Sequence, residues 1–143
     1  KEWRFTSISN RAKHVVANGD FTGSNIIDVA FILEDKTSQS TNLIILHNYS
    51  YLQWDLLYSE FYNGLAQING LKKNQLIYMD SAKLVPAPND GFFLISVSGK
   101  KAILYNPEEK KFKEYYQYSN IEIENLKNGT GYNEQENYQE NDN

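Results

Sequence analysis

Short apolar stretches, each bounded by residues that favour turns, are the feature that most restricts the fold of this chain. The bounding residues are Gly, Asn, Asp, Pro and Ser. Apolar runs of this kind are typical of β-strands, whereas a helix would show apolar residues at intervals of three and four. The predicted strands are Trp3–Ile8, His14–Ala17, Asp28–Leu33, Asn42–His47, Gln53–Ser59, Gln75–Lys83, Phe92–Ser98, Lys101–Tyr105 and Phe112–Tyr118. We therefore predict a mainly β protein with antiparallel sheets.

The last three predicted strands form a C-terminal meander over residues 92–118. Ser98-Gly99-Lys100 is a short loop whose glycine can adopt a positive φ. Pro107 occupies a turn position, where its fixed φ is favourable. We expect this meander to pack with a second sheet formed by the strands that precede it.

One short helix is conceivable at Ser59–Ile68. Phe61, Leu65 and Ile68 recur there at helical spacing, although Gly64 would cost such a helix about 1 kcal/mol relative to Ala.

Charge is divided unevenly along the chain. Residues 1–120 hold thirteen Lys and Arg and twelve Asp and Glu, whereas residues 121–143 hold one Lys and six acids, a net charge of −5. The last stretch has few apolar residues and cannot bury enough surface by itself to offset its loss of entropy on ordering. We therefore predict one β-rich domain over residues 1–120 and a polar, acidic C-terminal tail over residues 121–143.

The composition excludes several kinds of chemistry. The 143 residues fit a single domain, and the chain has no cysteine, which excludes disulfides and thiolate metal sites. The lysine clusters are short and separated, so we expect no nucleic-acid partner. The apolar runs are far shorter than the roughly 20 residues that span a bilayer, so we expect no membrane span.

The sequence begins at Lys1 without an initial Met, and Trp3–Ile8 already has the pattern of a strand. A cleaved signal peptide would explain this start, as would a shortened version of the chain. A signal peptide would place the protein in the periplasm or outside the cell, and this is the location that we expect.

A loop with the spacing of calcium ligands begins at Asp20. Oxygen-bearing side chains stand at positions one, three, five and nine of this loop, namely Asp20, Thr22, Ser24 and Asp28. Calcium loops use alternate side chains around a turn to build an oxygen shell. Thr22 and Ser24 are weak replacements for Asp or Asn, so a turn held by side-chain hydrogen bonds is the favoured interpretation and calcium the alternative.

The segment Asp20–Ala30, followed by apolar residues 31–33 and 43–46, resembles a single FG-GAP or VCBS repeat of the kind found in small secreted bacterial proteins. This resemblance implies a sheet like a propeller blade and an extracytoplasmic location. The family's calcium ligands correspond to Asp20, Thr22, Ser24 and Asp28, where the two hydroxyl residues depart from the pattern. A complete propeller needs several blades, which one loop in this chain cannot supply.

No set of residues in the sequence suggests an enzyme. His14 and His47 each lie in a predicted strand without the spacing of a zinc motif, and no nucleophile motif or phosphate-binding loop is present. Glu34-Asp35 and Glu108-Glu109 are paired carboxylates at predicted turns, where we expect solvated charges rather than the acid and base of a glycosidase.

Binding to another protein is the function that remains. Tyrosine is favoured at interfaces because it offers a large contact area with a polar end. The predicted partner-binding residues are Tyr49, Tyr51, Trp54, Tyr58, Tyr115, Tyr116 and Tyr118. An immunity or inhibitor protein that neutralises a secreted toxin or enzyme is one specific version. A calcium-stabilised structural or adhesive module is the alternative, and a cell-wall hydrolase is a third class that would need clustered carboxylates.

Overall fold

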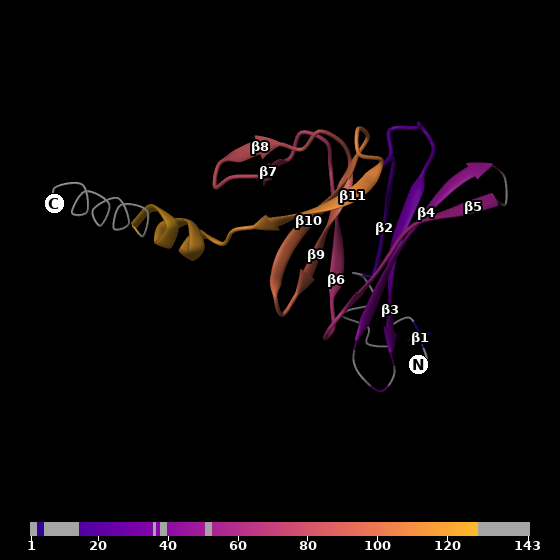
Figure 1. Cartoon of the computed structure of the whole chain (residues 1–143), viewed down its shortest axis with the longest axis horizontal. Coiled ribbons are helices and arrows are strands. Elements are labelled where there is room, and N and C mark those ends of the chain that lie inside the picture. The colour runs from indigo at the N-terminus through magenta and orange to yellow at the C-terminus, as the bar shows by residue number, and fades with distance from the viewer. Residues whose placement is uncertain (1–2, 5–14, 36, 38–39, 51–52, 129–143) are drawn as a thin grey trace.

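The computed structural model describes residues 3–4, 15–35, 37, 40–50 and 53–128. These residues form three antiparallel sheets and one short helix over residues 120–128, so the predicted fold class is confirmed (Figure 1). The strands are β1 (Trp3–Arg4), β2 (Val16–Gly19), β3 (Asp28–Asp35), β4 (Thr41–Ser50), β5 (Gln53–Tyr62), β6 (Gln67–Leu71), β7 (Leu76–Tyr78), β8 (Leu84–Pro86), β9 (Gly91–Ser96), β10 (Gly99–Asn106) and β11 (Lys111–Gln117).

The first sheet consists of β1 to β5. Its strand order is β1-β3-β4-β5, and β2 also pairs with β3. The two longest strands, β4 and β5, form a hairpin whose far end leans away from the rest of the molecule in Figure 1. All of these pairings are antiparallel.

The second sheet has the order β11-β10-β9-β6. Strands β9, β10 and β11 form the predicted C-terminal meander, which is therefore confirmed. Gly99, the first residue of β10 after the turn from β9, has a φ of 119°, the positive value that the sequence predicts.

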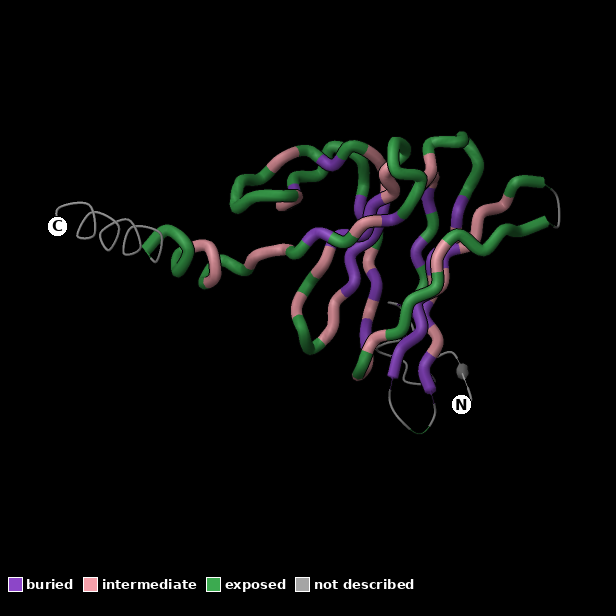
Figure 2. Tube along the Cα trace, viewed as in Figure 1, coloured by how far each residue is buried: buried purple, intermediate pink, exposed green. Residues whose placement is uncertain are grey.

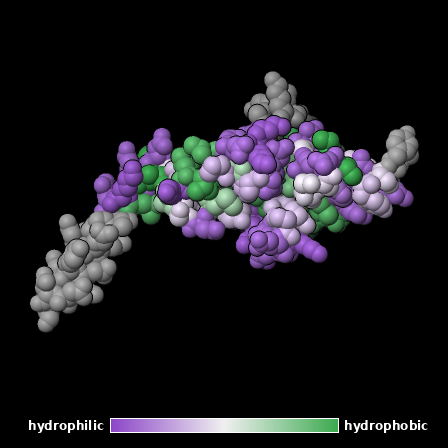
Figure 3. Space-filling view, turned by 90° about the horizontal axis from the view of Figure 1, so that it is seen from above, coloured by the Kyte–Doolittle hydropathy of each residue, from purple (hydrophilic) through white to green (hydrophobic). Residues whose placement is uncertain are grey.

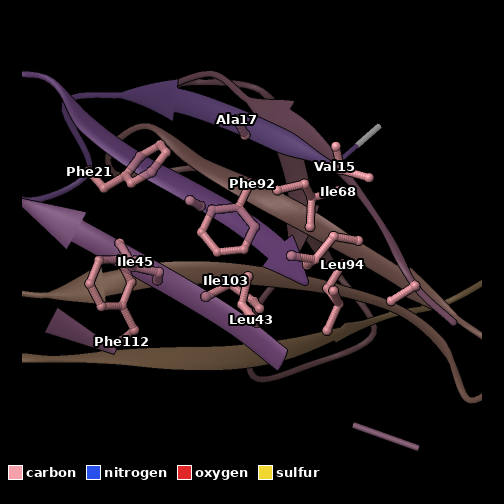
Figure 4. Close-up of a cluster of buried hydrophobic side chains, with 13 residues drawn as sticks. Val15, Ala17, Phe21, Leu43, Ile45, Ile68, Phe92, Leu94, Ile103 and Phe112 are labelled. Carbon is pink, nitrogen blue, oxygen red and sulfur yellow. The ribbon is translucent and has the colours of Figure 1, made fainter. Parts of the chain in front are cut away.

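The two sheets pack face to face around the main core (Figure 4). Alternate residues of each strand point into this core, as the pleat of a sheet requires. The buried residues are Val15, Ala17, Phe21, Ala30, Ile32, Leu43, Ile45, Ala66, Ile68, Phe92, Leu94, Ile103 and Phe112.

The β7–β8 hairpin forms a third layer on the opposite face of the second sheet. Ile77 and Ala87 from this layer are buried with a second set of sheet residues, namely Leu71, Phe93, Ala102, Leu104 and Tyr115. The second sheet is therefore covered on both faces. Seen from above in Figure 3, hydrophobic atoms gather over this hairpin, where Leu76 and Leu84 are exposed.

The prediction of a short helix at Ser59–Ile68 is wrong. Strand β5 continues to Tyr62, and β6 begins at Gln67. Between them Gly64 has a φ of 80°, which belongs to a turn and not to a helix. Pairing with β4 extends to Thr41 opposite Tyr62, and this tertiary pairing overrides the weak helical spacing.

The helix that does form lies at the start of the predicted tail. Ser119 and Glu122 make a reciprocal capping box: the Glu122 N–H donates to Ser119 Oγ at 3.2 Å, and the Ser119 N–H donates to Glu122 Oε1 at 3.0 Å. Local hydrogen bonds thus order residues 120–128, which have too few apolar side chains for a core. Residues 129–143 of the predicted tail lie outside the described residues.

No helix in the part of the chain that the structure describes is long and apolar enough to cross a membrane.

Candidate functional site

The outward side of the first sheet is as apolar as the side that faces the core. Cross-strand partners share a face, so Ala30 and Ile45 mark the core side, while Val29, Leu46 and Leu56 form a row on the opposite side. Continuing the alternation along the strands defines the outer face. Its apolar residues are Val16, Val29, Phe31, Leu33, Ile44, Leu46, Trp54, Leu56 and Phe61.

Several of these side chains are strongly exposed. The exposed fraction is 63% for Leu56, 60% for Phe61, 49% for Val16 and 46% for Trp54. An antiparallel sheet with one face in water normally has polar residues on that face. Figure 2 shows β5 exposed along most of its length, whereas β3, which β4 separates from β5 in the sheet, is buried or half-buried. Whereas β7–β8 covers the second sheet, no strand or helix among the described residues covers this outer face.

Strand β5 is also an edge strand. Within the described part of the chain it pairs only with β4, so its other side presents backbone groups that have no strand beside them. The ladder shifts register between Ile45 and Leu46, because Ile45 lies opposite Tyr58 and Leu46 lies opposite Leu56. Leu57 is the extra residue of this β-bulge.

The segment that builds the first sheet is acidic. Between residues 15 and 62 the sequence has one Lys and no Arg, against six carboxylates at Asp20, Asp28, Glu34, Asp35, Asp55 and Glu60. Asp55 and Glu60 lie on β5 and are exposed. Proteins protect edge strands with lysine, proline, β-bulges or inward-pointing charges. β5 contains no lysine or proline, and its protection consists of the bulge at Leu57 and the carboxylates on its core side.

A polar cluster closes the seam between β5 and the edge strand β11 of the second sheet. Tyr58 Oη lies 3.3 Å from Tyr62 Oη, and both hydroxyls donate to Glu114, which also binds Lys101 Nζ at 3.2 Å. Burial raises the pKa of Tyr58 from 10.0 to about 12, and burial and the hydrogen bond to Glu114 raise the pKa of Tyr62 strongly. Both tyrosines therefore remain neutral donors to Glu114 at physiological pH.

The loop from Asp20 to Asp28 is held by its own carboxylates. Asp28 is fully buried, and its Oδ2 accepts the backbone N–H groups of Phe21 at 2.9 Å and Thr22 at 3.1 Å and lies 3.1 Å from Thr22 Oγ1. Its Oδ1 lies 2.5 Å from His47 Nδ1 on β4. Asp28 thus fixes the loop to the first sheet.

Asp20 has the same kind of role at the exposed end of the loop. Its two carboxylate oxygens accept the backbone N–H groups of Ser24 at 2.9 Å and Asn25 at 2.8 Å. No group of three or more His, Cys, Asp or Glu side chains that could hold a metal ion occurs among the described residues. Both carboxylates of this loop therefore accept hydrogen bonds from the loop's own backbone, and calcium binding remains a prediction to be tested.

The predicted partner-binding residues do not form one surface. Trp54 and Tyr49 are exposed at the far end of the β4–β5 hairpin, whereas Tyr58 turns inward to the seam. Tyr115 is buried under β7–β8. Tyr116 and Tyr118 stack edge to face at 5.3 Å near the helix, on the other side of the molecule from the hairpin (Figure 1). Tyr51 lies outside the described residues.

The titratable residues considered for catalysis have structural surroundings. Glu108 and Glu109 lie at an exposed turn, as predicted, and Glu109 binds Lys113. The expectation of solvated charges at Glu34-Asp35 is wrong, because both residues are buried at the end of β3, where β1 pairs with them. His14 lies outside the described residues.

Sequence reasoning missed the outer face and the contact between Asp28 and His47. Val29, Phe31 and Leu33 alternate with core residues in one continuous apolar run, which is typical of a strand buried on both faces. That run was the available signal. The contact between Asp28 and His47 depends on the register between β3 and β4, in which the two residues lie opposite each other. This register cannot be deduced from the sequence alone.

Three kinds of known proteins were compared with this chain. No protein-family model, curated protein or solved structure shows a significant match to this chain. The resemblance to FG-GAP and VCBS repeats therefore remains a prediction.

Proposed function

We propose that this protein is a non-enzymatic protein-binding module that uses the outer face of its first sheet. The observation that carries this proposal is that both faces of the sheet are apolar, while only one of them is covered among the described residues. Exposed, contiguous apolar surface of this kind marks sites of protein interaction. Trp54, Leu56 and Phe61 supply large side chains of the type that dominate binding energy at interfaces.

The negative charge of this protein favours a partner that is basic. The acidic segment between residues 15 and 62 and the acidic tail both favour a positively charged protein and would raise its rate of association. An immunity or inhibitor protein directed at a secreted toxin or enzyme is the specific version that we propose, with a periplasmic or extracellular location.

The experiment compares affinity capture by two double variants. Leu56→Asp with Phe61→Asp places charge on the outer face, and Leu76→Asp with Leu84→Asp places the same charge on the exposed side of β7–β8. We expect a partner that the wild-type chain and the β7–β8 variant retain and that the outer-face variant loses. Circular dichroism and thermal unfolding are the controls that test whether both variants are folded.

Equal retention of every captured protein by both variants would contradict the proposal, since the outer face would then contribute no binding energy. Loss of the partner from the β7–β8 variant alone would move the interaction surface to the third layer.

A further inference from the structure

We propose that β5 binds its partner by strand addition, and that the partner supplies an extended segment in which apolar and basic residues alternate. This inference rests on the proposed function and specifies the partner's chemistry. It follows from three features of β5: the edge along which no described strand pairs with it, the apolar residues on its outer side and the carboxylates on its core side.

The outer edge of β5 supplies the main-chain part of the interaction. β5 is ten residues long, and among the described strands it makes its ladder with β4 alone. An extended peptide can therefore add as a sixth strand and hydrogen-bond to the remaining N–H and C=O groups. Main-chain pairing of this kind gives affinity without regard to sequence, and the side chains next to the edge decide which sequence is preferred.

The bulge at Leu57 divides the edge into two regular parts. From Tyr58 to Tyr62 the alternation is uninterrupted, with Ser59 and Phe61 on the outer side and Glu60 on the core side. Before the bulge, Trp54 and Leu56 lie on the outer side and Asp55 on the core side. A strand added to either part meets apolar side chains on one of its faces and a carboxylate on the other.

This arrangement selects the pattern of the added strand. Side chains on its outer face extend the apolar surface of Leu56 and Phe61, and side chains on its other face approach Asp55 and Glu60. Lysine or arginine at alternate positions would pair with these carboxylates, while glutamate would repel them. The second copy of this chain is a poor occupant, because β5 against β5 brings together two strands that carry acids and no bases.

The test uses three fluorescent nine-residue peptides and the full chain. The first alternates lysine with valine, the second alternates glutamate with valine, and the third has the composition of the first with its valines in one block. Fluorescence anisotropy at low salt measures the dissociation constants. We expect the first peptide to bind at least roughly tenfold more tightly than either control, a preference that weakens as salt is raised.

Two variants that change the net charge by the same amount test where on the protein the peptide binds. Glu60→Lys removes a carboxylate at the edge, and Asp80→Lys removes an exposed one in the turn between β7 and β8. Glu60→Lys should weaken the first peptide roughly tenfold, and Asp80→Lys should leave its binding within about twofold. Hydrogen exchange should slow in residues 53–62 when the first peptide is bound, because strand addition protects edge amides.

Equal binding of the alternating and blocked basic peptides, or equal weakening by both variants, would overturn strand addition in favour of general attraction between opposite charges. A sedimenting dimer that Leu56→Asp dissociates would assign the edge to a second copy. If none of the peptides binds while the outer-face variant still loses its captured partner, this inference fails and the proposed function stands.

Discussion

His47 Nδ1 lies 2.5 Å from Asp28 Oδ1, so a strand residue and the last residue of the Asp20–Asp28 loop are joined inside the protein. Asp28 is fully buried, and its other oxygen accepts two backbone N–H groups of the loop. A buried carboxylate requires this number of partners because its desolvation is costly. The contact explains how a loop with the spacing of calcium ligands can be ordered by hydrogen bonds.

Replacing Asp28 should therefore destabilise the fold far more than replacing Asp20. Asp28→Ala leaves the buried N–H of Phe21 without its acceptor and should lower the free energy of unfolding by roughly 3 kcal/mol. Asp20→Ala removes hydrogen bonds at an exposed turn and should cost about 1 kcal/mol. Urea denaturation of the two variants beside the wild type measures the difference.

The effect of calcium on thermal stability tests whether hydrogen bonds alone hold this loop. If hydrogen bonds hold it, neither calcium nor a chelator should change the melting temperature of the wild-type chain. A rise in melting temperature with calcium that disappears in Asp20→Ala would show that the loop binds the metal, as the resemblance to FG-GAP repeats implies.

The sequence predicts the sheets well because strand patterns are local. The meander after Gly91 needs only apolar alternation and turn residues, and Gly99 adopts the positive φ expected of it. The helix capped by Ser119 and Glu122 was equally local, and the S-x-x-E spacing of a capping box was its readable signal. The low apolar content of residues 121–143 favours a disordered tail, and the local hydrogen bonds of the capping box override it over the first turns.

Features that depend on register between distant residues could not be predicted. Tyr58 and Tyr115 were expected at an interface, yet one turns to the seam and the other is buried under β7–β8. Which face a strand residue occupies changes with a shift of one position, and the bulge at Leu57 makes such a shift within β5. The apolar run of β3 indicates burial on both faces, but only the assembled sheets show which face no described strand or helix covers.

Gly91 should tolerate no side chain, because a Cβ placed there would lie 2.4 Å from the Ile103 carbonyl oxygen and 2.7 Å from Leu104 Cδ2. Gly91→Ala must therefore displace the backbone of β10, and we expect it to destabilise the protein by about 1–3 kcal/mol. Gly70→Ala is the matched control, since a Cβ there meets nothing within 4 Å. Thermal unfolding distinguishes them, and equal melting temperatures would contradict the close approach of β9 and β10.

The two faces of the first sheet should respond differently to truncation. Ile45 is fully buried between the sheets, and Ile45→Ala should cost roughly 2–5 kcal/mol. Leu56 is 63% exposed on the outer face, and Leu56→Ala should change the free energy of unfolding by less than about 0.5 kcal/mol. Denaturant titration measures both. A large loss for Leu56→Ala would show that another part of the chain covers the outer face.

Alkaline pH should destabilise the protein through Tyr58 and Tyr62. The pKa of Tyr58 is raised from 10.0 to about 12, mainly by burial, and that of Tyr62 is raised further by burial and by Glu114. Above pH 10 the unfolded chain loses these protons while the folded chain keeps them, so the stabilising contribution is complete below pH 10. It decreases as the pH rises from 10 to about 12.

Replacing both tyrosines by phenylalanine removes this titration from the seam. Glu114 keeps its contact with Lys101, and the rings can still pack against the core. The midpoint of urea unfolding should therefore fall less steeply between pH 10 and about 12 in the double variant than in the wild type. Tyr49→Phe, at an exposed site outside the seam, should follow the wild type. Parallel curves for all three proteins would mean that the seam hydroxyls ionise as readily in the folded chain as in the unfolded one, and would contradict their burial beside Glu114.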